Sequence, residues 1–148
     1  MDRKWCIVNV EAAIYREDKW LVIKRSEKEE HAPGAISFVG GKVEVTKASL
    51  NILEEALKRE IMEEVGIEVY DDIQYIESKS FLTDKGEPVV DVVFLCRYKS
   101  GEPRCVSVDE VSGVFWLSAQ EILEDVNTPI WVKQSLRIAE KMRLNQKN

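Results

Sequence analysis

The chain has little of what a disulfide scaffold or a histidine-built metal centre requires. Its three cysteines, Cys6, Cys96 and Cys105, are an odd number without CxxC spacing, which disfavours a disulfide framework or a structural zinc site. The single histidine, His31, excludes a histidine-rich metal site, and no GxSxG motif supports serine hydrolysis. Any bound metal therefore depends on carboxylates, which favour Mg²⁺ or Mn²⁺.

Long apolar runs are missing as well. No stretch approaches the roughly 20 residues that span a bilayer, and the N-terminus lacks the apolar segment of a secretory signal, so we expect a cytoplasmic protein. The 21 basic and 27 acidic side chains give a net charge of −6, which disfavours nucleic-acid polymers and anionic membranes as partners. The 148 residues, 45% of them hydrophobic, predict a single domain over residues 1–148.

Apolar runs between turn residues predict strands near residues 4–15, 20–24, 35–39, 73–82, 89–98 and 114–117. Ser118 and Glu121 form a capping box that opens a short helix. Thr128 and Pro129 predict an N-cap followed by proline at the first position of a C-terminal helix. Because strands and helices do not alternate regularly, the expected class is α/β of the α+β type.

The longest helix is predicted between these strands. Apolar residues recur along one face at spacings of three and four, at Leu50, Leu53, Leu57, Ile61 and Val65. Gly66 then stands where a C-terminal cap is favoured. Glu60, Glu63 and Glu64 fall within about 100° of arc at the edge of this face. Their repulsion favours a bound divalent cation, although a solvated charged face is the usual alternative.

The segment before this helix has two interpretations. Gly40-Gly41 is expected to form a turn that allows close approach and offers a backbone carbonyl to a metal. Residues 45–52 either add one helical turn with Thr46 as N-cap, or loop out before an Asn51 cap that faces Glu54.

Taken together, Gly41-Lys42-Val43-Glu44 and Arg59-Glu60-Ile61-Met62-Glu63-Glu64-Val65-Gly66-Ile67 resemble the signature of the Nudix hydrolases. The second half matches at every defined position, and the first half matches through Glu44. The box, approximately residues 41–67, has about four extra residues in its first half. Its middle glutamate is missing, and Lys47 or Asn51 stands there instead.

The resemblance implies a mixed β-sheet sandwiched between helices. It implies hydrolysis of a nucleoside diphosphate linked to another group, by water attack on phosphorus with Mg²⁺ or Mn²⁺ bound. The metal ligands would be the Gly41 carbonyl and the side chains of Glu44, Glu60, Glu63 and Glu64. Arg59 would orient the glutamates by charge-assisted hydrogen bonds, and Glu63 and Glu64 would also belong to the catalytic set.

The MutT branch, whose members hydrolyse nucleoside triphosphates, is the most similar. Phe38-Val39-Gly40-Gly41-Lys42 resembles its Phe-Pro-Gly-Gly-Lys, so Lys42 would contact substrate, and Phe38 either lines a base pocket or is a core aromatic. Arg25 resembles a phosphate-binding strand end. Glu110, six residues before Trp116, resembles the loop glutamate that assists metal-bound water. Asn127 resembles a purine-reading asparagine, with a helix-initiating turn as the alternative.

Other members of the family fit less well. The downstream proline of ADP-ribose hydrolases would fall near Phe81, and the tyrosine of dinucleoside polyphosphate hydrolases is missing at residues 82–84. A nucleotide-sugar or ADP-ribose type pyrophosphatase remains the second hypothesis, and a non-catalytic nucleotide sensor the third. The expected partner is a small nucleotide bound by a monomer or homodimer.

Overall fold

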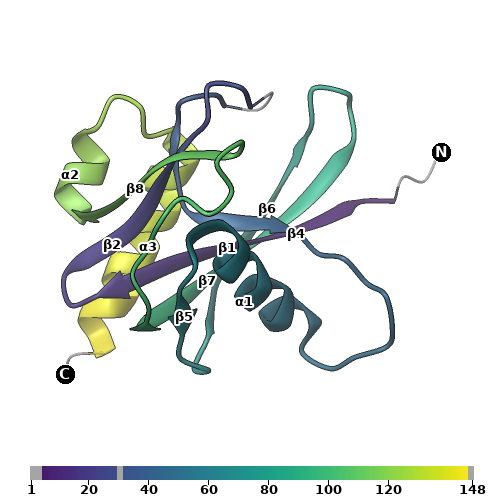
Figure 1. Cartoon of the computed structure of the whole chain (residues 1–148), viewed down its shortest axis with the longest axis horizontal. Coiled ribbons are helices and arrows are strands. Elements are labelled where there is room, and N and C mark those ends of the chain that lie inside the picture. The colour runs from purple at the N-terminus through teal and green to yellow at the C-terminus, as the bar shows by residue number, and fades with distance from the viewer. Residues whose placement is uncertain (1–4, 30–31, 147–148) are drawn as a thin grey trace.

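The protein is described over residues 5–29 and 32–146 by a computed structural model (Figure 1). His31, the residue on which the exclusion of a histidine site rests, lies outside the described residues. The elements in chain order are β1 (Ile7–Arg16), β2 (Lys19–Arg25), β3 (Ile36–Ser37), β4 (Val39–Lys42), α1 (Ile52–Val65), β5 (Glu68–Val69), β6 (Gln74–Leu82), β7 (Pro88–Ser100), β8 (Val111–Ser118), α2 (Ala119–Glu124) and α3 (Ile130–Gln146).

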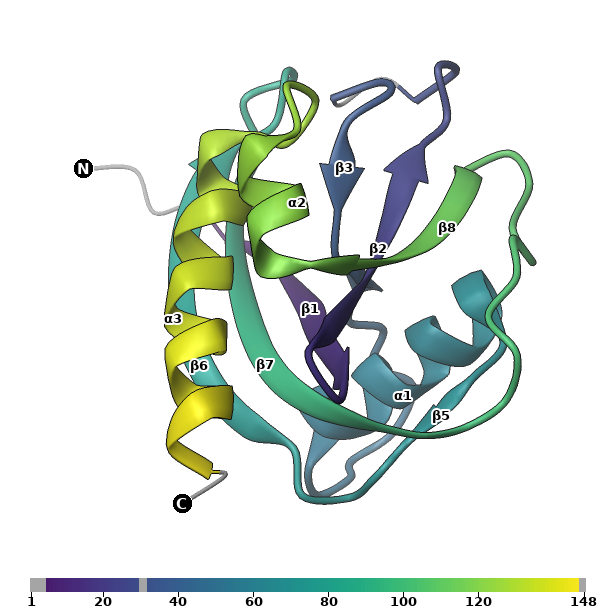
Figure 2. The same ribbon diagram turned by 90° about the vertical axis from the view of Figure 1, so that its left-hand side faces the viewer.

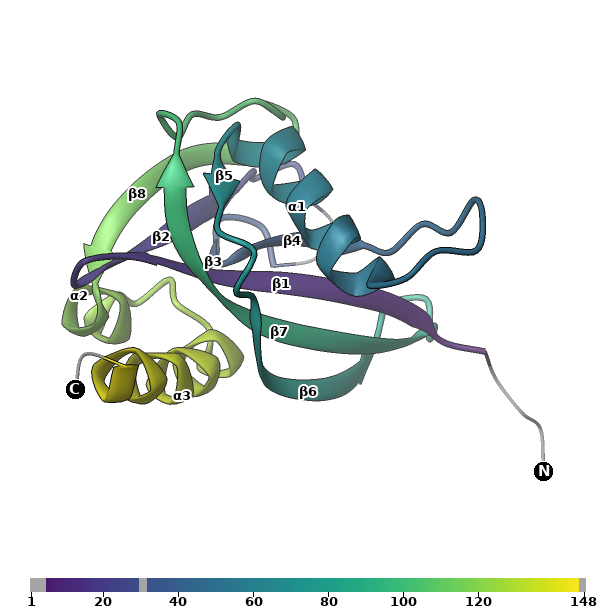
Figure 3. The ribbon, with the colours of Figure 1, turned by 90° about the horizontal axis from the view of Figure 1, so that it is seen from below.

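A mixed sheet separates α1 from the other two helices, as Figures 2 and 3 show from two sides. Leu57 and Ile61 of α1 pack with Val10 of β1 in one apolar cluster. Leu136 of α3 packs with Ala13 of β1 in a second cluster on the other face. The predicted sheet sandwiched between helices is therefore confirmed.

Strand β1 lies at the centre of this arrangement. It runs parallel to β7 and antiparallel to β2 and β4. Alternation along β1 directs Val10 and Ala12 to the α1 cluster and Ala13 to the α3 cluster. Glu11, between Val10 and Ala12, therefore lies on the α3 side of the sheet.

The predicted capping residues of two helices are confirmed. Gly66 is left-handed, with φ 70° and ψ 30°, and its N–H donates to the carbonyls of Ile61 and Met62. Ser118 Oγ accepts from the N–H of Glu121 at 3.1 Å, and the Glu121 side chain accepts from the N–H of Ser118 at 3.0 Å. Local sequence is sufficient for these caps because each motif is completed within a few residues.

The glycine pair and the start of α1 differ from the sequence-based expectation. Gly40 and Gly41 belong to β4, where they pair with β1, and they do not form a turn. Residues 43–51 loop out, so α1 begins at Ile52 without the extra turn. Asn51 takes the N-cap position in a left-handed conformation and its side chain does not cap. Leu50 is 84% exposed, so its predicted place on the apolar face is wrong.

The predicted N-cap of the C-terminal helix is also wrong. Thr128 is buried, and its hydroxyl has no hydrogen-bond partner among the described residues. The N–H groups of Val132 and Lys133 reach the Pro129 carbonyl, which places Pro129 just before the helix. The Thr128 side chain is therefore buried in the protein and does not cap the helix.

Within the described residues, no helix is both long enough and apolar enough to span a bilayer.

Candidate active site

Helix α1 presents its three motif glutamates to different surroundings. Glu64 is buried, with 5% exposed. The Glu60 side chain is 13% exposed, whereas that of Glu63 is 56% exposed. The helix is therefore turned so that Glu60 and Glu64 face the protein and Glu63 stands at the rim.

Strand β4 brings its two glycines against these carboxylates. A Cβ on Gly41 would lie 2.4 Å from Cδ of Glu60, so a larger residue there would displace the Glu60 carboxylate. A Cβ on Gly40 would lie 2.1 Å from the Val10 carbonyl oxygen of β1. The Gly40 N–H donates to the Glu64 carboxylate. The two glycines of β4 therefore lie directly against Glu60 and Glu64.

Arg59 connects two of the glutamates to the end of β4. Its Nη1 lies 3.2 Å from Oε1 of Glu60 and 3.3 Å from Oε2 of Glu63. Its Nη2 donates to the Lys42 carbonyl at 3.3 Å. Such charge-assisted contacts hold both carboxylates in place.

Two further carboxylates belong to the same electrostatic environment. Burial, followed by the charges of Glu60 and Glu110, raises the pKa of Glu64 to about 8. Burial also raises the pKa of Glu60, against the opposing effect of Arg59, and the neighbouring carboxylates add to the rise: Glu63, Glu110 and Glu44. We call Glu44, Glu60, Glu63, Glu64 and Glu110 the carboxylate cluster. It gathers the acidic side chains predicted from the motif and from the loop before β8.

The carboxylate cluster has the chemistry of a site for a hard divalent cation. It offers oxygen donors whose negative charges destabilise one another, directly beside the two glycines of β4. As the side chains stand, no three acidic, cysteine or histidine residues of the described ranges converge to hold an ion. Glu60 and Glu63 form ion pairs with Arg59 instead. The residue types fit Mg²⁺ or Mn²⁺, and the ion pairs with Arg59 would have to loosen.

A cleft of about 950 Å³ extends from the carboxylate cluster to the α3 side of the sheet. Arg25, Phe38 and Lys42 line it. Arg25 pairs with Glu29 at 3.2 Å. Phe38 is 3% exposed and packs in the α3 cluster, so both of its proposed roles remain compatible with its position.

Arg59 and Glu63 are not among the residues that line the cleft, and neither is a third predicted site residue, Asn127. Its side chain is exposed and is not among those that line the cleft. Its N–H donates to Asp125 Oδ1 at 2.8 Å, and its carbonyl accepts from the N–H of Ile36 at 3.0 Å. These contacts are those of a turn before a helix.

Sequence reasoning missed a pair of acids at the other end of the cleft. Glu11 of β1 and Asp91 of β7 line it, and Asp91 is fully buried. We call these two residues the acid pair. The available signal was an acidic residue inside each of two apolar runs, Val10-Glu11-Ala12 and Val90-Asp91-Val92, because charges are rarely buried without a partner.

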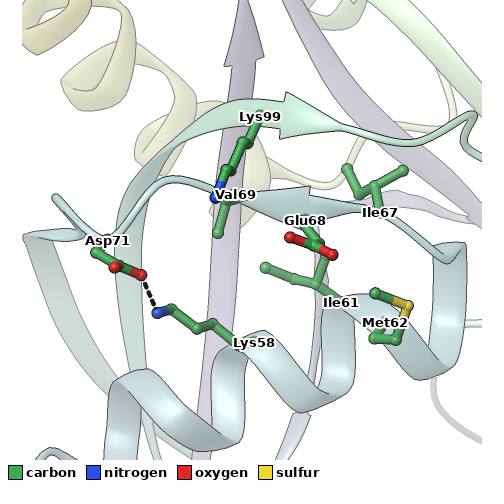
Figure 4. A pocket seen from close by; sticks show the side chains of 8 residues that line it. All are labelled: Lys58, Ile61, Met62, Ile67, Glu68, Val69, Asp71 and Lys99. Carbon is green, nitrogen blue, oxygen red and sulfur yellow. Dashed lines mark hydrogen bonds and ion pairs between the residues drawn. The ribbon is translucent and has the colours of Figure 1, made fainter.

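A second pocket of about 220 Å³ lies against the opposite side of α1 (Figure 4). Ile61, Met62 and Val69 form its apolar wall, and Lys58 and Asp71 form an ion pair across it. Its lining has two acidic residues, Glu68 and Asp71, and Asp71 is already paired with Lys58. The larger cleft is therefore the candidate active site.

Comparison with known proteins identifies the family of the chain. The NUDIX domain family matches residues 7–136. An uncharacterized Nudix hydrolase of Shigella flexneri, YfcD, is 35% identical over 129 residues, which cover 80% of this chain and 67% of that protein. The chain belongs to the Nudix family of hydrolases.

Solved structures extend the comparison. A MutT NUDIX hydrolase from Burkholderia pseudomallei aligns with a TM-score of 0.74 and 29% identity, covering 90% of this chain and 98% of that one. A MutT protein from Methanosarcina mazei Go1 aligns with a TM-score of 0.76 and 22% identity, covering 97% and 99%. Within its family this chain is MutT-like, an enzyme of the class that hydrolyses nucleoside diphosphates linked to another group.

Proposed function

We propose that the protein is a metal-dependent pyrophosphohydrolase of nucleoside triphosphates or related nucleoside diphosphate compounds. The observation that carries this proposal is the carboxylate cluster at one end of a cleft large enough for a nucleotide. Burial and mutual repulsion make these carboxylates unfavourable without a cation. A nucleotide phosphate chain that arrives with a divalent ion would relieve that cost.

The residues that would hold Mg²⁺, or Mn²⁺, are Glu60, Glu63 and Glu64, supplemented by Glu44 and the Gly41 carbonyl. When bound, the ion screens phosphate charge and lowers the pKa of water. Arg59 keeps the glutamates oriented, as its contacts to Glu60 and Glu63 support. We assign Arg59 as a positioning residue for that reason.

The remaining roles follow from position in the cleft. Glu110 is the proposed base that takes a proton from the attacking water, since its charge acts on both Glu60 and Glu64. Arg25 and Lys42 line the cleft and would bind phosphate oxygens. Phe38 would contribute to the base pocket.

A second candidate is hydrolysis of ADP-ribose or a nucleotide sugar. The NUDIX domain of Shewanella oneidensis NrtR, described in complex with ADP ribose, shares the fold with a TM-score of 0.70 and 17% identity over 97% of this chain. This likeness concerns the fold alone. A non-catalytic sensor is less favoured because all three motif glutamates are present.

The test is release of the nucleoside monophosphate, the product common to all of these reactions, from a panel of nucleoside triphosphates, nucleotide sugars and ADP-ribose, with Mg²⁺ and with chelator. We expect Mg²⁺-dependent release, with a triphosphate as the best substrate. Binding without release by any compound would overturn the enzymatic proposal in favour of a sensor. Faster release from ADP-ribose would favour the second candidate.

A further inference from the structure

The acid pair is part of a polar row that crosses three strands on the floor of the cleft. Asn9, Asp91 and Lys79 stand side by side in the register of β1, β7 and β6. Glu11 lies two residues along β1 from Asn9, on the same face. All four side chains line the cleft on the side of the sheet that faces α3.

Hydrogen bonds leave one buried oxygen of this row unexplained. Asn9 Nδ2 donates to Asp91 Oδ1 at 2.7 Å. Asp91 Oδ2 receives no bond from the nitrogen and hydroxyl donors of the described residues. The neighbouring Glu11 carboxyl lies close enough to Asp91 for a hydrogen bond when one of the two acids holds a proton.

The charges of the row nearly cancel. An acid pair with one proton carries a single negative charge, and Lys79 carries a positive one. The Lys79 ammonium is fixed by the Trp131 carbonyl at 3.3 Å and by Ser135 Oγ at 3.1 Å. Burial and the Asp91 charge raise the pKa of Glu11 to about 8, and Lys79 and Arg25 act in the opposite direction. A neutral site of this kind suits neither a phosphate nor a divalent cation.

The row keeps hydrogen-bond acceptors that these bonds do not use. When Glu11 donates its proton to Asp91, the other Glu11 oxygen accepts. Asn9 donates through its nitrogen, so its amide oxygen also accepts. Two neighbouring acceptors match the two N–H groups of one amino group.

Aromatic surface stands near this row. Phe81 of β6 and Trp131 of α3 both line the same cleft and are 38% and 40% exposed. Planar side chains of this type stack on nucleobases. The cleft therefore offers aromatic surface as well as polar groups to the organic end of a nucleotide.

We infer that Glu11 and Asn9 read an exocyclic amino group of the substrate's nucleobase, with Asp91 as the positioning residue that fixes both. This inference rests on the proposed function, because it assigns the base to the polar row on β1, β7 and β6 and the phosphates to the carboxylate cluster. Discrimination by an amino group is effective, since an analogue that lacks it leaves the site's polar atoms unpaired.

The test uses triphosphate pairs that differ at the amino position: guanine with hypoxanthine, adenine with unsubstituted purine, and cytosine with uracil. Hydrolysis is followed as kcat/KM, and binding is followed by calorimetry with the α,β-methylene analogues. In at least one pair we expect the amino-bearing member to be favoured about tenfold or more in both readouts. A preference in KM with little change in kcat would be typical of ground-state recognition.

Two variants at one position separate recognition from a general role of charge. Glu11→Gln keeps a donor for Asp91 and an acceptor for the base, so it should retain the preference. Glu11→Met has neither and should reduce the preference to near unity. A charged carboxylate in a different role would be lost equally in both variants, which would overturn the inference. Thermal melting checks that each variant folds. If Glu11→Met does not fold, the triphosphate pairs measured with the wild type test the inference.

The outcomes distinguish the two proposals. Ratios near unity in all three pairs, together with normal hydrolysis, would overturn the inference and leave the proposed function standing. A preference for ribose over deoxyribose nucleotides, without a preference for the amino group, would assign the polar row to the sugar. That outcome would also overturn the inference. Amino-dependent binding without hydrolysis would support the inference while the enzymatic proposal fails.

Discussion

The two ends of the cleft are both acidic, but they balance their charge in different ways. The carboxylate cluster gathers five glutamates, with Arg59 as the cation that contacts two of them. The acid pair has an amide donor in Asn9 and a nearby lysine, and burial together with the Asp91 charge raises the pKa of Glu11. Acidity by itself therefore does not define a metal site. The compensating groups differ, and we expect a cation at the carboxylate cluster and not at the acid pair.

The most severe way to break this comparison is to remove a charge from the carboxylate cluster. Glu64→Gln should lower turnover by orders of magnitude at saturating Mg²⁺, because bound metal supplies several kcal/mol of charge stabilisation. Glu63→Gln should act in the same direction. Glu55→Gln, an exposed glutamate on the same helix, is the control and should leave turnover unchanged. Near-normal turnover by Glu64→Gln would exclude it from the site.

The next largest effect is expected in the loop before β8. Glu110→Gln should lower kcat by roughly a hundredfold to ten-thousandfold with a modest change in KM, as for a lost general base. Asp109→Asn changes the adjacent exposed acid and is the matched control. Steady-state kinetics on both variants measures the difference. An unchanged kcat would move the role of base to Glu44 or to a glutamate of α1.

The metal-free protein offers a test of the charge imbalance by pH. The pKa of Glu64 is raised from 4.5 to about 8, so the folded state holds a proton that the unfolded chain releases. The stabilisation is complete below about pH 4.5 and is lost as pH rises toward 8, by at most about 1.4 kcal/mol per pH unit. Urea unfolding in chelator should show Glu64→Gln to be less pH-dependent than the wild type.

At pH 8 the wild type and Glu64→Gln should differ in the free energy of unfolding. Glu64→Gln is neutral at every pH, so it should be more stable than the wild type there, while Glu55→Gln should not differ. Equal pH slopes for the wild type and Glu64→Gln would mean that the carboxylate is ionised at no cost in the folded state. Glu11 retains its own pH dependence in both proteins.

The smallest effect should come from Asn127. Its exposed side chain does not line the cleft, and its backbone makes the turn contacts. Asn127→Ala should therefore change kcat/KM for every triphosphate by about twofold or less, within the range of ordinary surface substitutions. A selective loss with one purine triphosphate would restore Asn127 as a base-reading residue and sharpen the boundary of the base site.

The two ends of the cleft also differ in how far the sequence predicts them. Glu60 and Glu64 follow from helical periodicity beside a motif, because residues four apart share a face. The acid pair depends on the parallel register of β1 and β7, which joins positions 80 residues apart and leaves no local pattern. Asn51 illustrates another limit: composition suggested a side-chain cap, but the left-handed backbone there directs the side chain elsewhere.

The same distinction explains the errors at element boundaries. The sequence identifies the strand run before Gly40-Gly41, but the pairing that extends β4 through both glycines is a tertiary contact with β1. Leu50 fits the apolar spacing of α1, yet periodicity does not show where a helix begins. Local rules therefore predict the existence of elements better than their ends.

The loop between β4 and α1 has a practical consequence for protein engineering. Val45 is 69% exposed and Leu50 is 84% exposed, so neither apolar side chain of this loop is packed in the core. Doubling a flexible loop costs only about 0.6 kcal/mol of closure entropy, and exposed loops accept insertions well. A fluorophore or peptide tag inserted at residues 46–49 would therefore be tolerated, and it would enter the chain shortly after Glu44 of the carboxylate cluster.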